Sequence, residues 1–327
     1  MPPIWINLST EQFPASSLLA QGIAAEAAGF DAVGCSDHFQ PWWPDGESPF
    51  CWPVLSAIAQ ATERAPVGTG VTPPMAYRYH PVLVAQAFMT IEEMFPGRCF
   101  LGVGSGEALN EVPFGITEWI TPRQKVEYFE EALEVIRRLW DGETVTYEGE
   151  HIRTVDAKLY TRASSRPKLY VSAFGPKAAG VAARWGDGIW TLGDPERGPK
   201  ILDAYRSACS DAGREPGEII IQSGFSWAET DEAALEASRV WKGTIPPEFY
   251  RDDWHDPQAM QDHVADLPDD PFLEANAIGA DPQVHLDKIE QLTDMGATIV
   301  CLQSFSGADP VGAVEFYGRE VLPRARG

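Results

Sequence analysis

The sequence predicts an α/β protein of the (β/α)8 barrel class. Short apolar segments rich in Val, Ile and aromatic residues recur along the 327 residues, and amphipathic helical segments lie between them. This alternation is typical of parallel βαβ units. The presence of eight such strand segments favours a closed barrel over a doubly wound sheet. Both architectures place their chemistry at the carboxyl ends of the strands.

The predicted strands are short runs dominated by β-branched, other apolar and glycine residues. They span Ile4–Leu8, Ala32–Cys35, Val67–Val71, Cys99–Val103, Leu169–Ala173, Gly188–Leu192, Ile219–Phe225 and Thr298–Gln303. Several of the helices between them begin with proline, which suits the first helical position because no N–H donor is needed there. The clearest helices are Ser17–Ala28, Pro81–Met94, Pro122–Leu139 and Pro282–Met295.

We expect residues 1–327 to form a single barrel domain with insertions, since barrels of roughly 250 residues are single domains. Two segments do not fit the βα repeat. Residues 144–159 alternate around the Glu148-Gly149 turn and predict a β-hairpin. Residues 243–275 are rich in Pro, Asp and Trp, and this insertion before the eighth strand is either a substrate lid or a packed surface segment.

The charge balance narrows the class of partner. The chain has 48 Asp and Glu against 25 Lys and Arg, a net charge of −23 at pH 7. Such a field disfavours binding to nucleic acid or to an anionic membrane. No apolar run reaches the roughly 18 residues of a membrane span, and the N-terminus lacks the basic region of an export signal, so we expect a soluble cytoplasmic protein. The five cysteines form no CxxC pair and the six histidines show no ligand spacing, which predicts no metal site.

Acid and base groups follow three of the predicted strands. Because the carboxyl ends of barrel strands converge, we expect these groups to lie close together. A histidine there can accept an alcohol proton near neutral pH, and the neighbouring Asp37 and tryptophans favour this role of His38 over that of a hydrogen-bonded structural histidine. Glu107 either contacts a ligand or stabilises a helix N-terminus by its charge. The residues are Glu11 after the first strand, Asp37, His38 and Trp42 after the second, and Glu107 after the fourth.

Three glycine-containing loops are suited to hold a ligand. Residues 68–74 combine glycines and prolines, which fits an unusual peptide geometry against a flat ligand or a plain turn. Residues 104–106 are small enough for their N–H groups to approach a ligand closely. Gly175 precedes a helix whose first N–H groups can receive a phosphate. A nicotinamide-binding fold is disfavoured because GVGSGEALNE lacks the third glycine of the dinucleotide fingerprint.

The motifs STEQF, SDHFQPW, GTGVTP, FLGVGSGEALNE, SAFGP and WGDGIWT occur in this order and spacing. Together they resemble the deazaflavin-dependent glucose-6-phosphate dehydrogenase group of the bacterial luciferase-like superfamily. The match covers most of residues 1–195 and returns near Ile278–Ser304. The resemblance implies a luciferase-like (β/α)8 barrel, usually a homodimer, that binds coenzyme F420. It also implies hydride transfer between a substrate carbon and C5 of this 8-hydroxy-5-deazaflavin.

The resemblance assigns roles to individual residues. His38 matches the family's base on the substrate hydroxyl, and Glu107 matches the acid that protonates the ring at N1. Trp42 and Glu11 match residues that hold the substrate. A base and an acid on two sides of a hydride path are what alcohol oxidation requires. Positions that match cofactor contacts are Asp37, Gly70, Val71 (joined to Gly70 by a cis bond in relatives), Ser105, Gly106, Asn110, Phe174, Gly175, Lys177, Ala178 and Thr191.

One departure from the family concerns the substrate. Sugar-phosphate members bind the phosphate with two lysines and an arginine, and the matching positions here are Asp194 and, by alignment, the vicinity of Asp262 and Ala275. The sequence has no Lys or Arg between Arg251 and Lys288. A carboxylate beside a phosphate repels it. We therefore expect the small-molecule substrate to be a neutral alcohol, an unphosphorylated sugar or the corresponding carbonyl compound.

Three other functions stay open at this point. The chain could be a glucose-6-phosphate dehydrogenase after all. It could be an FMN-dependent monooxygenase, since the superfamily contains these, although oxygen chemistry needs N5 of a true flavin where the deazaflavin has carbon. It could also be a non-catalytic ligand-binding barrel, which the joint presence of His38, Trp42, Glu11 and Glu107 disfavours.

Overall fold

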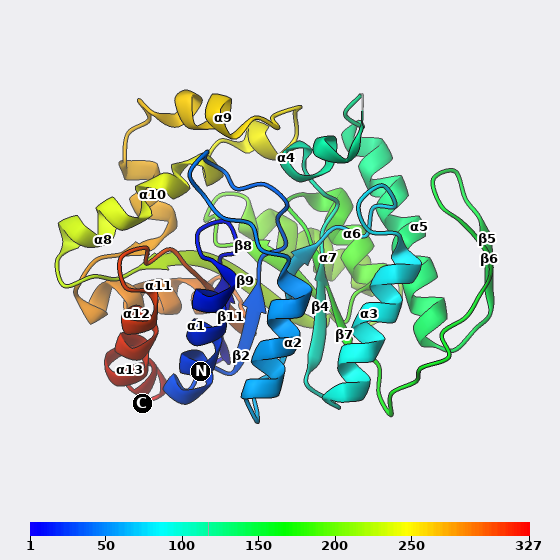
Figure 1. Cartoon of the computed structure of the whole chain (residues 1–327), viewed down its shortest axis with the longest axis horizontal. Coiled ribbons are helices and arrows are strands. Elements are labelled where there is room, and N and C mark those ends of the chain that lie inside the picture. Colours follow the sequence, from blue (N-terminus) through cyan, green and yellow to red (C-terminus); the bar gives the residue numbers. More distant parts are fainter. Residues whose placement is uncertain (117) are drawn as a thin grey trace.

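The computed structural model of the protein describes residues 1–116 and 118–327. Within these residues, eight parallel strands close into a barrel, which confirms the predicted fold class (Figure 1). Each predicted strand coincides with an observed one, and no end differs by more than one residue. In the order of their pairing around the barrel the strands are β1 (Ile4–Leu8), β2 (Ala32–Cys35), β3 (Val67–Thr72), β4 (Cys99–Val103), β7 (Lys168–Ser172), β8 (Gly188–Leu192), β9 (Glu218–Ser226) and β11 (Ile299–Ser304).

Helices follow the strands and cover the outside of the barrel (Figure 1). The longest, α5, shows how the sequence sets a helix start. The Thr121 hydroxyl accepts the N–H of Gln124, whose side chain accepts the N–H of Thr121, and Pro122 occupies the first helical position. The main helices are α1 (Ala15–Ala28), α2 (Cys51–Ala61), α3 (Pro81–Met94), α5 (Pro122–Trp140), α6 (Pro176–Trp185), α7 (Gly198–Asp211), α8 (Asp231–Ser238), α11 (Pro282–Asp294) and α12 (Pro310–Phe316), and the chain closes with a π-helical turn (Tyr317–Val321) and α13 (Leu322–Arg326).

Aromatic side chains fill the interior of the barrel. Along β1, Ile4 and Ile6 pack outward against the helices, whereas Trp5 points inward, as the period of two along a strand requires. The Trp5 ring lies 4.7 Å from that of Phe100 and 6.2 Å from that of Trp190. We call Trp5, Phe100, Tyr170 and Trp190 the aromatic plug. Because the plug occupies the space between the strands, a ligand has to bind at an end of the barrel.

Two insertions leave the βα repeat. Strands β5 (Val145–Glu148) and β6 (Arg153–Ala157) form an antiparallel hairpin that projects from one side of the barrel in Figure 1. The second insertion lies between α8 and α11, and α9 within it lies at the same end of the barrel as α4 (Ala108–Glu111), which follows β4 (Figure 1). This insertion contains the 3-10 helices Arg239–Thr244 and Pro247–Tyr250, α9 (Pro257–Val264) and α10 (Asp270–Ala275), and we call it the 239–275 segment. The short strand β10 (Ala277–Ile278) follows it and pairs with β9. A separate 3-10 turn, Val112–Phe114, follows α4.

The 239–275 segment has its own apolar core. Trp241, Phe249, Met260 and Phe272 are buried, and they pack with Trp42 and Trp43 from the loop after β2 and with Phe305 after β11. The segment is therefore held by the hydrophobic effect against the loops at the carboxyl end of the strands. In the part of the chain that the structure describes, no helix combines the length and hydropathy needed to cross a bilayer.

Candidate active site

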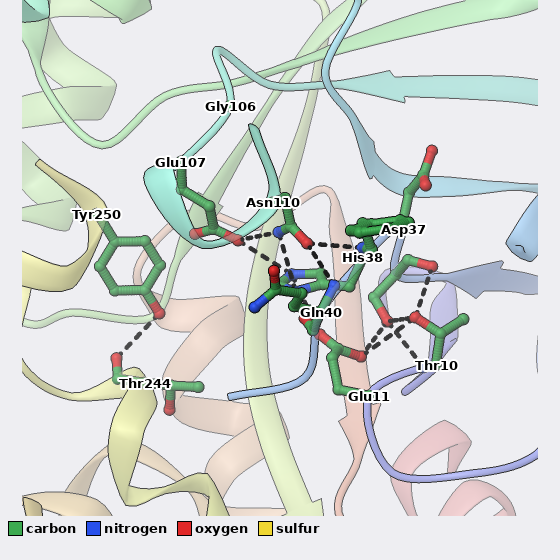
Figure 2. A network of polar contacts seen from close by, with 12 residues as sticks. Thr10, Glu11, Asp37, His38, Gln40, Gly106, Glu107, Asn110, Thr244 and Tyr250 are labelled. Atoms are coloured by element: carbon green, nitrogen blue, oxygen red, sulfur yellow. Dashed lines mark hydrogen bonds and ion pairs between the residues drawn. The ribbon is translucent and has the colours of Figure 1, made fainter. Parts of the chain in front are cut away.

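The loops after β1, β2 and β4 bring four polar side chains together at the carboxyl end of the barrel (Figure 2). The His38 Nε2 atom lies 3.3 Å from Glu11 Oε1 and 3.2 Å from Glu107 Oε1. The fourth member is Asn110, on α4. We call Glu11, His38, Glu107 and Asn110 the mouth cluster. Glu11, His38 and Glu107 thus converge as expected from the strand ends, and Trp42, the fourth residue predicted to be catalytic, lies beside His38.

Asn110 organises this cluster through its amide. Its Oδ1 accepts the main-chain N–H groups of Phe39 at 2.6 Å and Gln40 at 3.1 Å. Its Nδ2 donates to Glu107 Oε1 at 2.8 Å and lies 3.1 Å from His38 Nδ1. The carbonyl oxygen of Gln40 lies 3.2 Å from the same Nδ1. His38 Nδ1 therefore has both a donor and an acceptor beside it, so either tautomer of the ring is satisfied.

The two carboxyl groups of the mouth cluster lie in different surroundings. Glu11 is buried, and its Oε2 accepts hydrogen bonds from the hydroxyls of Ser36 and Thr10. Glu107 is held by Asn110, and burial raises the pKa of its carboxyl, while nearby His38 and Lys125 oppose that rise. Because burial disfavours the charged form, the Glu107 carboxyl is suited to keep a proton.

Aromatic rings form one wall of the cluster. Trp42 is buried, and its ring centroid lies 5.5 Å from that of His38 and 5.4 Å from that of Tyr250. Tyr250 comes from the 239–275 segment, and its hydroxyl donates to the Thr244 carbonyl at 3.0 Å. Phe174, half exposed after β7, stands edge-on to Tyr250 at 5.6 Å. A substrate next to His38 would therefore meet apolar surface on this side.

A cis peptide joins Gly70 to Val71 at the end of β3, as the resemblance implies. The Asn7 side chain donates to the Gly70 carbonyl at 3.0 Å. A Cβ on Gly70 would lie 2.6 Å from the Trp190 ring, and one on Gly104 would lie 2.7 Å from Val71. Glycine is required at both positions for steric reasons. The Gly70–Val71 peptide therefore lies directly against the aromatic plug, at the carboxyl end of β3.

The N-terminus of α6 is the part of the site suited to an anion. Gly175 precedes the helix, no described side chain caps it, and a Cβ built on Gly175 would meet no atom within 4 Å. The N–H groups of Lys177 and Ala178 belong to this uncapped first turn. Unpaired N–H groups and the positive end of the helix dipole together favour a phosphate.

The other predicted cofactor positions differ in their surroundings. Gly106 has a φ of 73°, in the left-handed region where glycine is favoured. Ser105 is half-buried beside it. Thr191 is buried, and its hydroxyl donates to the Ala173 carbonyl at 2.8 Å. Gly106 and Ser105 thus lie in the loop that carries Glu107, whereas Thr191 links β8 to β7.

Asp37 faces away from the mouth cluster, although it is adjacent to His38 in the sequence (Figure 2). Its Oδ1 accepts from Arg78 at 2.7 Å and from Tyr79 at 3.0 Å. Its Oδ2 accepts from Thr72 at 2.5 Å and from Trp52 at 3.2 Å. Both oxygens are therefore engaged by protein donors. The side chain predicted to contact the cofactor is occupied inside the fold.

Arg78 also lies 3.6 Å from Glu111, whose carboxyl is fully buried. Burial raises the pKa of Glu111 to about 8, and the nearby guanidinium of Arg78 opposes the rise. We call Asp37, Arg78, Tyr79 and Glu111 the Arg78 cluster. Sequence reasoning missed Arg78 and Glu111.

Sequence reasoning also missed Tyr250 and Lys125. The signal for Lys125 was its place on the apolar stripe of α5, three residues before Tyr128 and four before Phe129, where a lysine is buried only if it is paired.

A closed barrel with acid and base groups at the carboxyl ends of its strands has the architecture of a barrel enzyme. Residues 2–298 match the family model described as "Luciferase-like monooxygenase", and the chain belongs to this family. It is 38% identical to an F420-dependent glucose-6-phosphate dehydrogenase of Microbacterium testaceum, over 97% of this chain and 96% of that protein.

Two further relatives extend this picture. The chain is 37% identical to an F420-dependent hydroxymycolic acid dehydrogenase of Mycobacterium tuberculosis, over 99% of this chain and 88% of that protein. It matches a solved F420-dependent secondary alcohol dehydrogenase in complex with an F420-acetone adduct at a TM-score of 0.94 and 32% identity, covering 100% of this chain and 99% of that one. These relatives confirm the family group that the motifs predicted.

Proposed function

We propose that this protein binds coenzyme F420 and transfers a hydride between it and a neutral alcohol, an unphosphorylated sugar or the corresponding carbonyl compound. One observation carries the proposal: the His38 Nε2 atom faces two carboxyl groups at the mouth of a barrel whose relatives are F420-dependent dehydrogenases. A base beside an acid is what two-electron oxidation of an alcohol needs.

The residues present fit this cofactor. The Gly70–Val71 peptide offers a flat main-chain surface, and Gly106 lets the loop before Glu107 approach a ring closely. The open N-terminus of α6 at Gly175 suits the cofactor's phosphate. When bound, the deazaflavin supplies hydride chemistry at C5 coupled to a proton on a ring nitrogen.

His38 acts as the base in the direction of oxidation. With Nδ1–H donating to the Gln40 carbonyl, the Nε2 lone pair faces the site. Nε2 takes the hydroxyl proton, the hydrogen on the carbon that bears the hydroxyl leaves as hydride with the electron pair of the C–H bond, and a C=O bond forms. Glu11 then stabilises the imidazolium at 3.3 Å. In the direction of reduction the same proton returns to the oxygen.

Glu107 acts as the acid. Burial raises the pKa of its carboxyl above the ordinary value, which favours the protonated form that an acid needs. Asn110 holds Glu107 Oε1 at 2.8 Å and keeps the carboxyl pointed at the mouth. Glu107 can therefore supply or recover the proton that accompanies the hydride.

The surroundings support an uncharged substrate. Lys125 and Arg78, the buried cations near the mouth, are engaged by main-chain carbonyls and by Asp37. Asp194 accepts the N–H groups of Glu196 and Arg197, and Asp262 accepts the Gln258 amide at 2.8 Å. Carboxylates at the positions where relatives bind phosphate would repel a sugar phosphate.

We extend the proposal to the assembly. The 239–275 segment, whose Tyr250 lies against Trp42, covers the substrate side of a single barrel domain. From the resemblance we infer a homodimer that works in the cytoplasm. Sedimentation of the purified protein tests the oligomeric state.

Glucose-6-phosphate dehydrogenase activity is the second candidate, because the relative at 38% identity carries that name. FMN-dependent oxygenation is the third, because the family model is described as a monooxygenase.

One experiment separates all three. The protein is titrated with F420 and with FMN while cofactor fluorescence is followed, and neutral alcohols, free sugars and glucose 6-phosphate are then compared by loss of the deazaflavin absorbance. We expect F420 binding and a kcat/KM for the best neutral alcohol about tenfold or more above that for glucose 6-phosphate. Comparable values would establish the second candidate, and FMN binding without F420 binding would establish a flavoprotein.

A further inference from the structure

We propose that Lys125 is a positioning residue that clamps the 239–275 segment to the loop carrying Glu107. This inference rests on the proposed function, in which Glu107 is the acid. Lys125 Nζ donates to the Gly106 carbonyl at 3.0 Å and to the Tyr250 carbonyl at 3.1 Å. Gly106 directly precedes Glu107, and Figure 2 shows Gly106 and Tyr250 flanking it. One ammonium group thereby binds two main-chain carbonyls near Glu107, one in its own loop and one in the 239–275 segment.

The hydrogen-bonding capacity of this ammonium is fully used. Lys125 is buried, and its third N–H direction is met by the Trp119 ring, whose centroid lies 4.6 Å from Nζ. Burial lowers the pKa of this ammonium to about 8, and Glu107, Glu111 and Asp252 oppose that shift when they are ionised. A buried cation that is not paired is very costly, so the two carbonyls are held strongly in place.

A second donor reinforces the clamp. The Trp119 Nε1–H group donates to the carbonyl of Arg251 at 3.2 Å. Two consecutive carbonyls of the 239–275 segment, those of residues 250 and 251, are therefore bound by Lys125 in the first turn of α5 and by Trp119 in the loop before it. This helix is itself anchored by its capping box and by its packing on the barrel. Through Lys125 the clamp ties both the segment and the loop that carries Glu107 to this helix.

The clamp has a specific consequence for the proposed reaction. If Lys125 is lost, the loop of residues 104–111 and the turn at residues 247–252 can move independently. The Glu107 carboxyl then spends less time in the position where it can exchange its proton. Because this affects the chemical step, we expect kcat to fall more than KM rises.

Lys125→Met tests the clamp, because methionine keeps the apolar stem and removes the ammonium. Lys288→Met is the matched control: Lys288 is also buried and its Nζ donates to the Glu274 carbonyl at 2.8 Å, at the other end of the same segment. We expect hydrogen exchange of residues 104–111 and 247–252, measured without cofactor, to rise about tenfold or more in Lys125→Met only. We also expect weaker F420 binding and a kcat about tenfold lower or more.

Equal exchange and equal kcat in the two lysine variants would overturn the proposal. Trp119→Phe keeps the test decisive if Lys125→Met does not fold, because it removes only the hydrogen bond to residue 251. It should raise exchange of residues 247–252 by a smaller factor, and unchanged exchange there would then reject the clamp. If exchange is faster in Lys125→Met but the wild-type protein does not bind F420, the clamp is supported and the proposed function is rejected. The two ideas therefore fail separately.

Discussion

Asp37 and His38 are neighbours in the sequence but belong to two polar clusters of different character. In the Arg78 cluster, four protein donors engage the two oxygens of Asp37, so this carboxylate has no capacity left for a ligand. In the mouth cluster, His38 Nδ1 lies between a donor and an acceptor, and Nε2 faces two carboxyls. The difference teaches that saturation by fixed donors makes a group structural, whereas competing donors and acceptors leave it able to exchange a proton.

The largest effect that we expect is the loss of turnover in the His38→Ala variant, which tests the role of the mouth cluster in this comparison. Loss of the base should lower kcat about 100- to 10,000-fold. The fold should persist because the imidazole ring, unlike the Asp37 carboxylate, is not the partner of a buried arginine or lysine. Turnover with F420 and an alcohol measures the first expectation, and urea unfolding measures the second. Unaltered turnover would return the chain to the class of non-catalytic binding barrels.

Asp37→Ala should affect stability rather than chemistry. It removes the nearer of the two carboxyl groups beside the buried Arg78 guanidinium, and removing one member of a buried pair costs about 3–5 kcal/mol of unfolding free energy. Urea unfolding at neutral pH measures the loss, with Glu127→Ala as a control, because the Glu127–Arg123 pair is exposed and its loss should leave the midpoint nearly unchanged. A stable Asp37→Ala protein that no longer binds F420 would instead place Asp37 with the mouth cluster, as its sequence position predicts.

The smallest effect concerns Glu111, the member of the Arg78 cluster whose carboxyl oxygens accept no hydrogen bond among the described residues. Its pKa is raised from 4.5 to about 8, so the folded protein binds this proton more tightly than the unfolded chain. The resulting stability is fully present below pH 4.5 and declines as pH rises toward about 8.

Glu111→Gln removes this linkage, because the amide does not titrate. Each pKa unit is worth about 1.4 kcal/mol, so between pH 5 and pH 8 the wild type should lose roughly 1 kcal/mol or more beyond what the variant loses. Urea unfolding of both proteins at the two pH values gives this difference. Equal losses would show that Glu111 is ionised in the folded protein.

The barrel was predictable because its signals are local. Apolar runs with β-branched residues and proline-led helices each identify their own element, and the observed strands agree to within one residue. The gathering of Glu11, His38 and Glu107 was predictable for a topological reason, since the carboxyl ends of barrel strands converge. The cis bond at Gly70–Val71 was assigned from the family resemblance, because the glycines and prolines of residues 68–74 fit an unusual peptide geometry or a plain turn and do not say which bond is cis.

The distinction between Asp37 and His38 was not predictable, because it depends on residues that arrive later in the chain. Arg78 and Tyr79 reach Asp37 from the loop after β3, and nothing in the motif SDHFQPW signals them. Lys125 was missed for a different reason. Its partners are main-chain carbonyls, and carbonyls are the same for every residue type.

The aromatic plug has a consequence for the order in which ligands bind. Trp5, Phe100, Tyr170 and Trp190 fill the barrel below the Gly70–Val71 peptide. Anything that reaches His38 must therefore arrive and depart on the side covered by the 239–275 segment. When two ligands bind one above the other at this end of the barrel, the deeper one has to enter first and leave last. A compulsory binding order would then be dictated by the packing of four rings that never touch the reacting atoms.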